Sequence, residues 1–309
     1  MKNKSLFTLF TGLSVLYAVS CSKENISNAK AQSSSEEQLS NAVAVSICDQ
    51  FAYADTIFYP EELPDDYVVH PLNVLSGKYG AFPDELDINP RTGNIDITES
   101  ETGLRYLVWF VPTGSTDTCK KFITVSGINY MDSIYTLKNN ASFAVPVYNA
   151  TPSAAISCTG ICEFDDGPDD DDGDGAGDEP RAGQEVIPQG IAMDKSTGAI
   201  DLKQSIANGA LGVNPASGTF KDFMLNYRIS DGSSRALNKI AFRIYYYKSQ
   251  SQIPARLKRD LAAKQAQILL NQAGNTPQNV VYTINNTLVN KNGKGEVKCR
   301  PPYIIVVQN

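Results

Sequence analysis

The chain has 309 residues, 42% of them hydrophobic and 20% charged, which is enough for two domains of ordinary size. The formal net charge is −7, but ten acidic residues and no basic residue lie between 163 and 179. The rest of the chain therefore has 34 − 10 = 24 acidic residues against 27 basic ones. A nearly neutral body without a basic face interleaved with aromatic residues argues against a nucleic-acid partner.

The first residues have the pattern of a secretion signal. Two lysines precede an apolar run over residues 6–19, which is shorter than the ~20 residues that a membrane-spanning helix needs. The run ends in Ala-Val-Ser-Cys at Cys21, which resembles the lipobox of bacterial lipoproteins. The resemblance implies a signal peptide over 1–20 and acyl chains on Cys21, palmitate among them, that anchor the protein in a membrane. An ordinary signal peptide followed by a chance cysteine is the alternative.

Residues 21–49 are mostly polar and small, with few large apolar side chains. Such a segment cannot bury enough surface to offset its ordering entropy, so we expect a lipidated flexible tether. Charged residues soon after the lipidated cysteine are typical of surface-bound Bacteroidetes-type lipoproteins, and Ser-Lys-Glu at 22–24 resembles that signal. We therefore expect an outer-membrane lipoprotein of the cell envelope. The signal favours exposure on the cell surface, but the sequence does not decide which leaflet holds the anchor.

An internal repeat organises the chain after residue 50. Residues 86–97 read Leu-Asp-Ile-Asn-Pro-Arg-Thr-Gly-Asn-Ile-Asp-Ile, and residues 191–202 read Ile-Ala-Met-Asp-Lys-Ser-Thr-Gly-Ala-Ile-Asp-Leu. Both copies alternate apolar and polar residues around a Thr-Gly pair, which predicts a β-hairpin with glycine in its turn. A serine follows each turn at the same offset, Ser100 in one copy and Ser205 in the other.

Further matches extend each copy into a unit. Residues 55–59 and 132–136 resemble each other and open the two units. Runs rich in aromatic and β-branched residues predict strands at 105–111, 121–125, 223–229 and 240–247. Many short strands without alternating helices favour a sandwich over a parallel sheet.

The hairpin motif and the run Gly-Leu-Arg-Tyr-Leu-Val at 103–108 resemble the putative-Ig, cadherin-like repeats of bacterial surface proteins. The resemblance implies a mainly β fold with two tandem immunoglobulin-like β-sandwich domains, over residues 50–130 and 131–250. The second domain would carry an acidic loop insertion at 158–186. Such repeats serve as spacers, adhesion modules and carbohydrate-contacting units, and the fold does not choose among these roles.

The end of the chain departs from the repeat. Pro254 and Gly274 bound a stretch with apolar residues at helical spacing, which predicts an amphipathic helix. Strand-like runs follow at 280–284 and 303–307. We expect residues 251–309 to form an extension, a helix followed by a strand pair, that packs on the second domain.

The acidic segment is the sharpest candidate for a binding site. Four of its aspartates occupy positions 1, 3, 5 and 9 of a calcium-binding loop: Asp170, Asp172, Asp174 and Asp178. Arg181 stands at position 12, where such loops carry a bidentate glutamate. The composition predicts a solvated acidic loop, with weak calcium binding in the millimolar range as the alternative and no other cofactor.

No catalytic residue is predicted. His70 is the only histidine of the chain, so Ser-His-Asp chemistry, Cys-His chemistry and histidine-rich metal sites are hard to build. Trp109 is expected to pack inside a sandwich, with an exposed aromatic platform for sugar stacking as the alternative. The tyrosine run 245–247 must place residues on both faces of a strand, so at least one ring is expected to face outward or to lie at an interface.

Five cysteines remain besides the lipidated one, in an exported chain where disulfides are expected. They are Cys48, Cys119, Cys158, Cys162 and Cys299. The odd number leaves at least one thiol unpaired within the monomer. Cys158 and Cys162 are close enough to close a small ring, but the sequence does not decide the pairing.

Together these features predict a non-catalytic binding or adhesion module that is held to a membrane by its lipid. Its expected partner is a glycan or an envelope or host protein. A structural subunit of an envelope complex is a second hypothesis, because the same domains can hold a partner protein. A carboxylate-dependent enzyme acting on polysaccharides is the third, since acidic residues are plentiful and the sequence does not show which of them converge.

Overall fold

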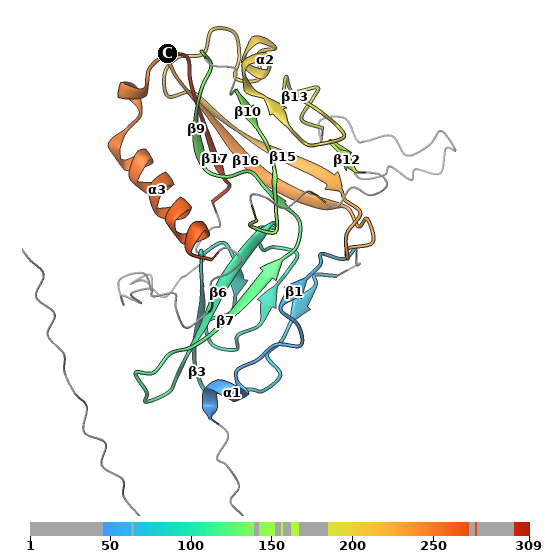
Figure 1. Ribbon diagram of the computed structural model, residues 1–309, viewed down its shortest axis with the longest axis vertical. Helices are drawn as coiled ribbons and strands as arrows, with labels where there is room; N and C mark the ends of the chain where they lie inside the picture. Colours follow the sequence, from blue (N-terminus) through green and yellow to red (C-terminus); the bar gives the residue numbers. More distant parts are fainter. Residues whose placement is uncertain are drawn as a thin grey trace, which may run out of the picture. The chain divides into compact units, whose positions relative to one another are not determined.

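In the computed structural model, residues Val45–Asn309 form one compact unit, distinct from Met1–Ala44. The structure describes residues 46–62, 65–138, 142–151, 156, 162–166, 185–271, 276 and 300–309. Most of the described secondary structure is β-strand, as predicted (Figure 1). The expected signal peptide and Cys21 lie outside the described residues.

The first part of the unit contains a four-stranded sheet with the order β1-β7-β6-β3 and a three-stranded sheet with the order β2-β5-β4. The elements are α1 (Ile47–Gln50), β1 (Ile57–Phe58), β2 (Val68–Val69), β3 (Gly77–Phe82), β4 (Asp87–Ile88), β5 (Ile95–Asp96), β6 (Leu104–Pro112) and β7 (Cys119–Val125). Alternate residues of β6, from Leu104 to Phe110, lie in one core with Ile95 of β5. The two sheets therefore pack face to face.

The second part repeats this plan on a larger scale. Its sheets have the orders β12-β15-β16-β17-β9 and β10-β14-β13, and β11 pairs with β8. The strands are β8 (Ile128–Asn129), β9 (Ser133–Thr136), β10 (Phe143–Ala144), β11 (Val147–Tyr148), β12 (Glu163–Phe164), β13 (Ala192–Met193), β14 (Ile200–Asp201), β15 (Phe220–Arg228), β16 (Asn238–Tyr247) and β17 (Tyr303–Val307). The long pair β15–β16 supplies Leu225 and Phe242 to a core that includes Ile200 of β14.

Three helical segments complete the second part: α2 (Leu202–Ala207), the 3₁₀ turn η1 (Gln250–Gln252) and α3 (Ala255–Leu270). Leu257 and Leu261 of α3 pack with Ile305 and Val307 of β17, in a cluster separate from the larger core. Figure 1 shows α3 beside β9 and β17. The predicted helix and the predicted strand at 303–307 are thus confirmed. The strand predicted at 280–284 lies outside the described residues.

The repeated sequence motif is also a structural repeat. The turn glycines Gly93 and Gly198 have φ angles of 74° and 69°, the left-handed region that favours glycine. Each glycine carbonyl accepts a hydrogen bond from a buried tyrosine hydroxyl, Tyr53 to Gly93 (2.6 Å) and Tyr130 to Gly198 (2.5 Å). The same local sequence therefore gives the same turn, held by the same side-chain contact.

The two serines that follow the turns act alike as well. The Ser100 hydroxyl donates to the Asp96 carbonyl oxygen (2.5 Å) and accepts from the Asp87 N–H (3.0 Å). The Ser205 hydroxyl makes the equivalent pair of bonds, at 2.6 and 2.9 Å. Each serine thus ties the end of its hairpin to the start.

Trp109 does not pack in the sandwich core, contrary to expectation. Because Val108 and Phe110 point into the core, Trp109 lies on the opposite face of β6. It stands opposite Gly80 of β3, where an added Cβ would lie 2.3 Å from the indole ring. The glycine leaves room for the indole to lie across the neighbouring strand.

Both ends of the expected acidic insertion, 158–186, belong to the fold. β12 pairs with β15, and Phe164 and Val186 are core residues. The buried Asp165 carboxylate accepts hydrogen bonds from the N–H groups of Val186 (2.5 Å) and Ile187 (2.9 Å). One acidic residue of the segment therefore joins its two ends instead of facing solvent.

A disulfide joins Cys48 and Cys119, which are 71 positions apart in the sequence. The Cys48 N–H also donates to the Ser46 hydroxyl at the start of α1 (3.2 Å). Residues 46–49, which the sequence placed in the tether, therefore belong to the folded unit. Cys162 is disulfide-bonded as well, whereas Cys158 and Cys299 lie outside the described residues.

Candidate functional site

The outer face of β15 and β16 carries large side chains that remain exposed. Phe220 and Met224 of β15 are 52% and 45% exposed, although both belong to a nine-residue strand. The register sets Phe220 opposite Tyr245 of β16, and Asp222 opposite Arg243. Residues two apart on a strand share a face, so these side chains form adjacent rows.

Arg243 is the centre of this group. Its guanidinium binds both oxygens of the Asp222 carboxylate, at 2.5 and 2.8 Å. It also lies 4.6 Å from the ring centre of Phe220, 5.8 Å from that of Tyr245 and 5.7 Å from that of Tyr303. The hydrogen bonds that Arg243 donates to Asp222 raise the pKa of Arg243, so the side chain stays charged. We call Phe220, Asp222, Met224, Arg243, Tyr245 and Tyr303 the aromatic–arginine face.

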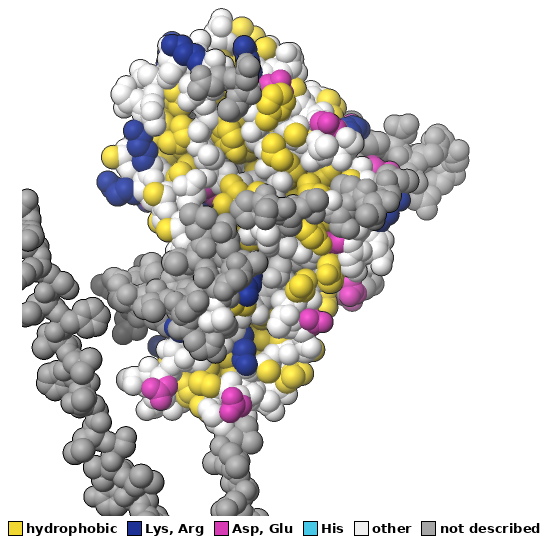
Figure 2. Space-filling view, in the orientation of Figure 1, with side chains coloured by type: hydrophobic (Ala, Val, Ile, Leu, Met, Phe, Trp, Pro, Cys, Tyr) yellow, Lys and Arg dark blue, Asp and Glu magenta, His cyan; other side chains and the backbone are white. Residues whose placement is uncertain are grey.

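This face has the composition of a contact surface. Aromatic residues, methionine and arginine are enriched where proteins bind partners, and a few such residues contribute most of the affinity. The rings offer π-faces for stacking, and the guanidinium–carboxylate pair offers planar donors and acceptors beside them. On the side shown in Figure 2, hydrophobic side chains gather over the strands of the second part, and several Lys and Arg side chains lie along α3.

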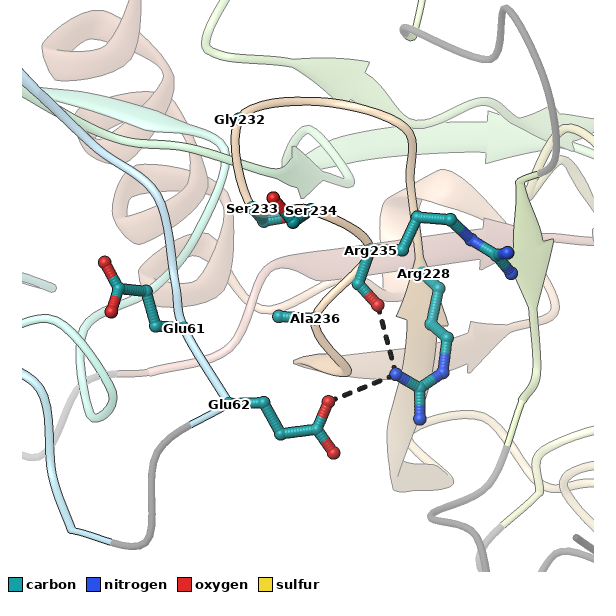
Figure 3. A pocket seen from close by; sticks show the side chains of 8 residues that line it. All are labelled: Glu61, Glu62, Arg228, Gly232, Ser233, Ser234, Arg235 and Ala236. Carbon is teal, nitrogen blue, oxygen red and sulfur yellow. Dashed lines mark hydrogen bonds and ion pairs between the residues drawn. The ribbon is translucent and has the colours of Figure 1, made fainter.

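A second candidate is an open polar pocket of about 490 Å³ between the segment after β1 and the β15–β16 loop (Figure 3). Its lining residues are Glu61, Glu62, Arg228, Gly232, Ser233, Ser234, Arg235 and Ala236. Arg228 binds Asp166 through Nε (3.0 Å) and Glu62 through Nη1 (3.2 Å). Arg235 binds Glu163 (2.7 Å). Since carboxylates already hold both guanidinium groups, the pocket is nearly neutral.

The loop of this pocket has an unusual backbone. Ser234 and Arg235 both have positive φ, 55° and 65°. The buried Ser233 hydroxyl makes no hydrogen bond to the described residues. No accessible nucleophile with an adjacent base is found among the described residues that line the pocket.

A buried charge cluster lies where the first part meets α3. Lys264 Nζ is 3.2 Å from Glu85, 3.0 Å from Glu101 and 4.0 Å from Asp132. Arg300 Nη1 is 2.7 Å from the second oxygen of Asp132. The side chains are at most 8% exposed, except that of Arg300 at 22%. We call these five residues the buried charge cluster.

The charges of this cluster do not balance when all groups are ionised. Burial raises the pKa of Glu85 from 4.5 to about 7, with the Glu101 charge adding to the effect and Lys264 opposing it. Burial also raises the pKa of Glu101. Burial alone would lower the pKa of Lys264, but the three carboxylates outweigh it and raise that pKa. The cluster therefore has two positive charges, and burial favours the protonated forms of Glu85 and Glu101.

Most of the site residues predicted from the sequence lie outside the described part of the chain. Asp170, Asp172, Asp174 and Asp178 lie outside the described residues, as does Cys21. Within the described part, no three His, Cys, Asp or Glu side chains are grouped to hold a metal ion. None of the helices described combines the length and apolar character that a bilayer span needs. His70 is exposed.

The tyrosine run behaves as predicted. Tyr246 points into the large core, whereas Tyr245 is half-buried on the opposite face and belongs to the aromatic–arginine face. Phe220, Asp222 and Arg243 were not predicted from the sequence as site residues. The alternating pattern was a signal for a strand starting at Phe220, but the pairing of Asp222 with Arg243 depends on register, which the sequence alone does not fix.

No protein-family model matches the chain, and no curated protein matches it. Among solved structures it matches human protocadherin-24 EC1-2 (crystal form II), at 10% identity over 61% of this chain and 92% of that chain. The TM-score of 0.18 is too low to carry a fold or function assignment. The function must therefore be inferred from the residues and their geometry.

Proposed function

We propose that the chain is a lipid-anchored, non-catalytic binding module of the cell envelope, and that its contact surface is the aromatic–arginine face. The observation that carries this proposal is the exposure of Phe220 and Met224 beside a guanidinium–carboxylate pair. Large apolar side chains exposed together on a sheet face lower the solubility of a protein. Such a patch is typical of a surface that contacts a partner.

The partner class that suits this face is a glycan. The ring of Phe220 and the half-buried ring of Tyr245 suit the apolar face of a pyranose. The Asp222–Arg243 pair lies beside them and supplies acceptors and donors for adjacent hydroxyl groups.

The position of Glu85, whose pKa is shifted, and the pairing of the pocket arginines favour binding over catalysis. Glu85 has a pKa moved to about 7, the range that suits a general acid, but its side chain is 3% exposed beneath Lys264. At the accessible pocket, Arg228 and Arg235 are paired with carboxylates. This carboxyl group, whose pKa suits proton transfer, is thus withdrawn from any substrate.

The test uses the soluble chain from Ser22 on a glycan array, followed by titration of each hit. We expect Phe220→Ala to weaken the best hit about tenfold, the effect of losing roughly 1.4 kcal/mol of contact energy. Val213→Ala is the matched control, because Val213 is 91% exposed and lies outside the face. Equal affinity of both variants, or tight binding to a protein with no glycan hit, would contradict glycan binding at this face.

The anchor is tested separately. Cells fed an alkyne palmitate analogue should label the chain, and Cys21→Ala should abolish the label and release the protein from the membrane fraction. Protease shaving of intact cells then distinguishes a surface module from one that faces the periplasm. Persistent labelling of Cys21→Ala would contradict lipidation at this cysteine.

A further inference from the structure

The two repeats can be aligned residue by residue. Tyr53 and Tyr130 bind the equivalent turn glycines, so Asp55 and Asp132, two positions later, are also equivalent. β1 begins two residues after Asp55, and β9 begins one residue after Asp132. The antiparallel pairs β6–β7 and β15–β16 correspond too, because each follows the Thr-Gly hairpin of its own repeat.

The repeats differ at one edge. In the first repeat β1 pairs directly with β7, in parallel, with Ile57 opposite Thr124. In the second repeat β9 is separated from β16 by β17, which is parallel to both neighbours. The last strand of the chain therefore occupies a slot that has no counterpart in the first repeat.

The apolar residues of β17 fill the slot between β9 and β16. Residues Ile304–Val307 are at most 1% exposed, and they alternate between two apolar clusters. Ile304 and Val306 belong to the large core, whereas Ile305 and Val307 pack beneath α3. An empty slot would expose both clusters and leave two strand edges unpaired.

The equivalent aspartates show how the slot selects its strand. Asp55 accepts hydrogen bonds from the N–H groups of the next two residues, Thr56 (2.6 Å) and Ile57 (3.3 Å). Asp132 instead binds Arg300 (2.7 Å) and the Tyr303 N–H (3.3 Å). The second repeat thus uses the same carboxylate to hold the incoming segment and to set its register.

We propose that this slot is a strand-binding site and that it also accepts the C-terminal strand of a second copy of this chain. The partners of β17 include β9, β16, α3, Asp132 and the large core, all of which a second copy presents identically. Exchange of a terminal element between identical copies preserves its contacts and is a low-cost route to assembly. An extended chain covers up to ~3.3 Å per residue, so residues 272–299 are long enough to reach a neighbouring copy.

The test uses paired cysteines at a registered position. Thr136 of β9 and Val307 of β17 are opposite each other, and Thr136→Cys and Val307→Cys are made in separate chains that carry different tags. All chains start at Ser22, and chains without the added cysteines are oxidised in parallel to measure any cross-links that the native cysteines form. The two chains are unfolded together in urea at acidic pH, refolded at several concentrations and then oxidised. The double variant in one chain checks that the geometry permits the bond.

The matched control places the cysteines in the first repeat, at Ile57 and Thr124 in separate chains, where no inserted strand separates β1 from β7. Exchange predicts a mixed-tag disulfide dimer that rises with concentration and exceeds the control at least tenfold. The proposal fails if the double variant closes its disulfide within single chains while the mixed chains give no dimer at any concentration. A control yield equal to the test yield would also overturn it, because the cross-links would then reflect random collision.

Discussion

Replacing Glu85 by glutamine isolates the pH dependence of the buried charge cluster. Glu85 has a pKa of about 7 in the folded protein, against an ordinary value of 4.5, because burial disfavours its charged form. Between pH 4.5 and pH 7 the folded state therefore binds more protons than the unfolded chain. The free energy of unfolding must then fall as the pH rises through this window.

The size of the effect follows from the two pKa values. Their difference corresponds to about 3 kcal/mol, since a tenfold change in a proton equilibrium is worth 1.36 kcal/mol. Wild-type protein should lose about that much stability between pH 4.5 and pH 7.5 through this carboxyl group alone. Glu85→Gln keeps the volume and cannot ionise, so its stability curve should be flatter by the same amount.

The assay is urea unfolding at half-unit steps of pH, monitored by tyrosine fluorescence and circular dichroism. Glu99→Gln is the matched control, because the Glu99 side chain is 56% exposed and forms a surface ion pair with Lys239. Its curve should run parallel to that of the wild type. Parallel curves for wild type and Glu85→Gln would refute the conclusion that burial raises the pKa of Glu85 in the folded protein.

Three further predictions concern separate features. Replacing both Cys48 and Cys119 by serine should cost about 4 kcal/mol of unfolding free energy, from the loop entropy of a 71-residue separation, and urea midpoints with intact controls measure it. Gly198→Ala should lower the free energy of unfolding by roughly 2–4 kcal/mol. The backbone at Gly198 has a positive φ, and an added Cβ would lie 2.7 Å from the ring of Phe164. Gly209→Ala, with positive φ but open space, should cost only about 1 kcal/mol. If the acidic loop binds calcium, millimolar calcium should raise Tm, and replacing its four aspartates by asparagine should remove that rise; an unchanged Tm in the intact protein excludes the site.

Features that depend on neighbouring residues were predictable. The Thr-Gly hairpins were identified from alternation and a glycine with positive φ, and both formed as expected. α2 was missed because Leu202 continues the alternating pattern of β14. The signal was Asp201, whose carboxylate accepts from the Gln204 N–H (3.0 Å) and begins the helix.

Features that depend on distant residues were not predictable. β17 was expected in a terminal strand pair, because its sequence shows only that it is apolar and β-branched. Its position between β9 and β16 follows from the fit of Ile304 and Ile305 to two different clusters. The Asp222–Arg243 pair depends on register in the same way.

The buried charge cluster explains how segments far apart in sequence form one body. Glu85 and Glu101 come from the first repeat, Asp132 opens the second, and Lys264 and Arg300 come from α3 and the segment before β17. Desolvating such charges costs free energy that their attraction does not fully return, so hydrophobic packing would hold these segments at least as tightly. What charges add is selectivity: an alternative packing of α3 would leave buried carboxylates without a cation. The cluster thus fixes where α3 lies on the second sheet, and therefore how much of that sheet remains uncovered as the aromatic–arginine face.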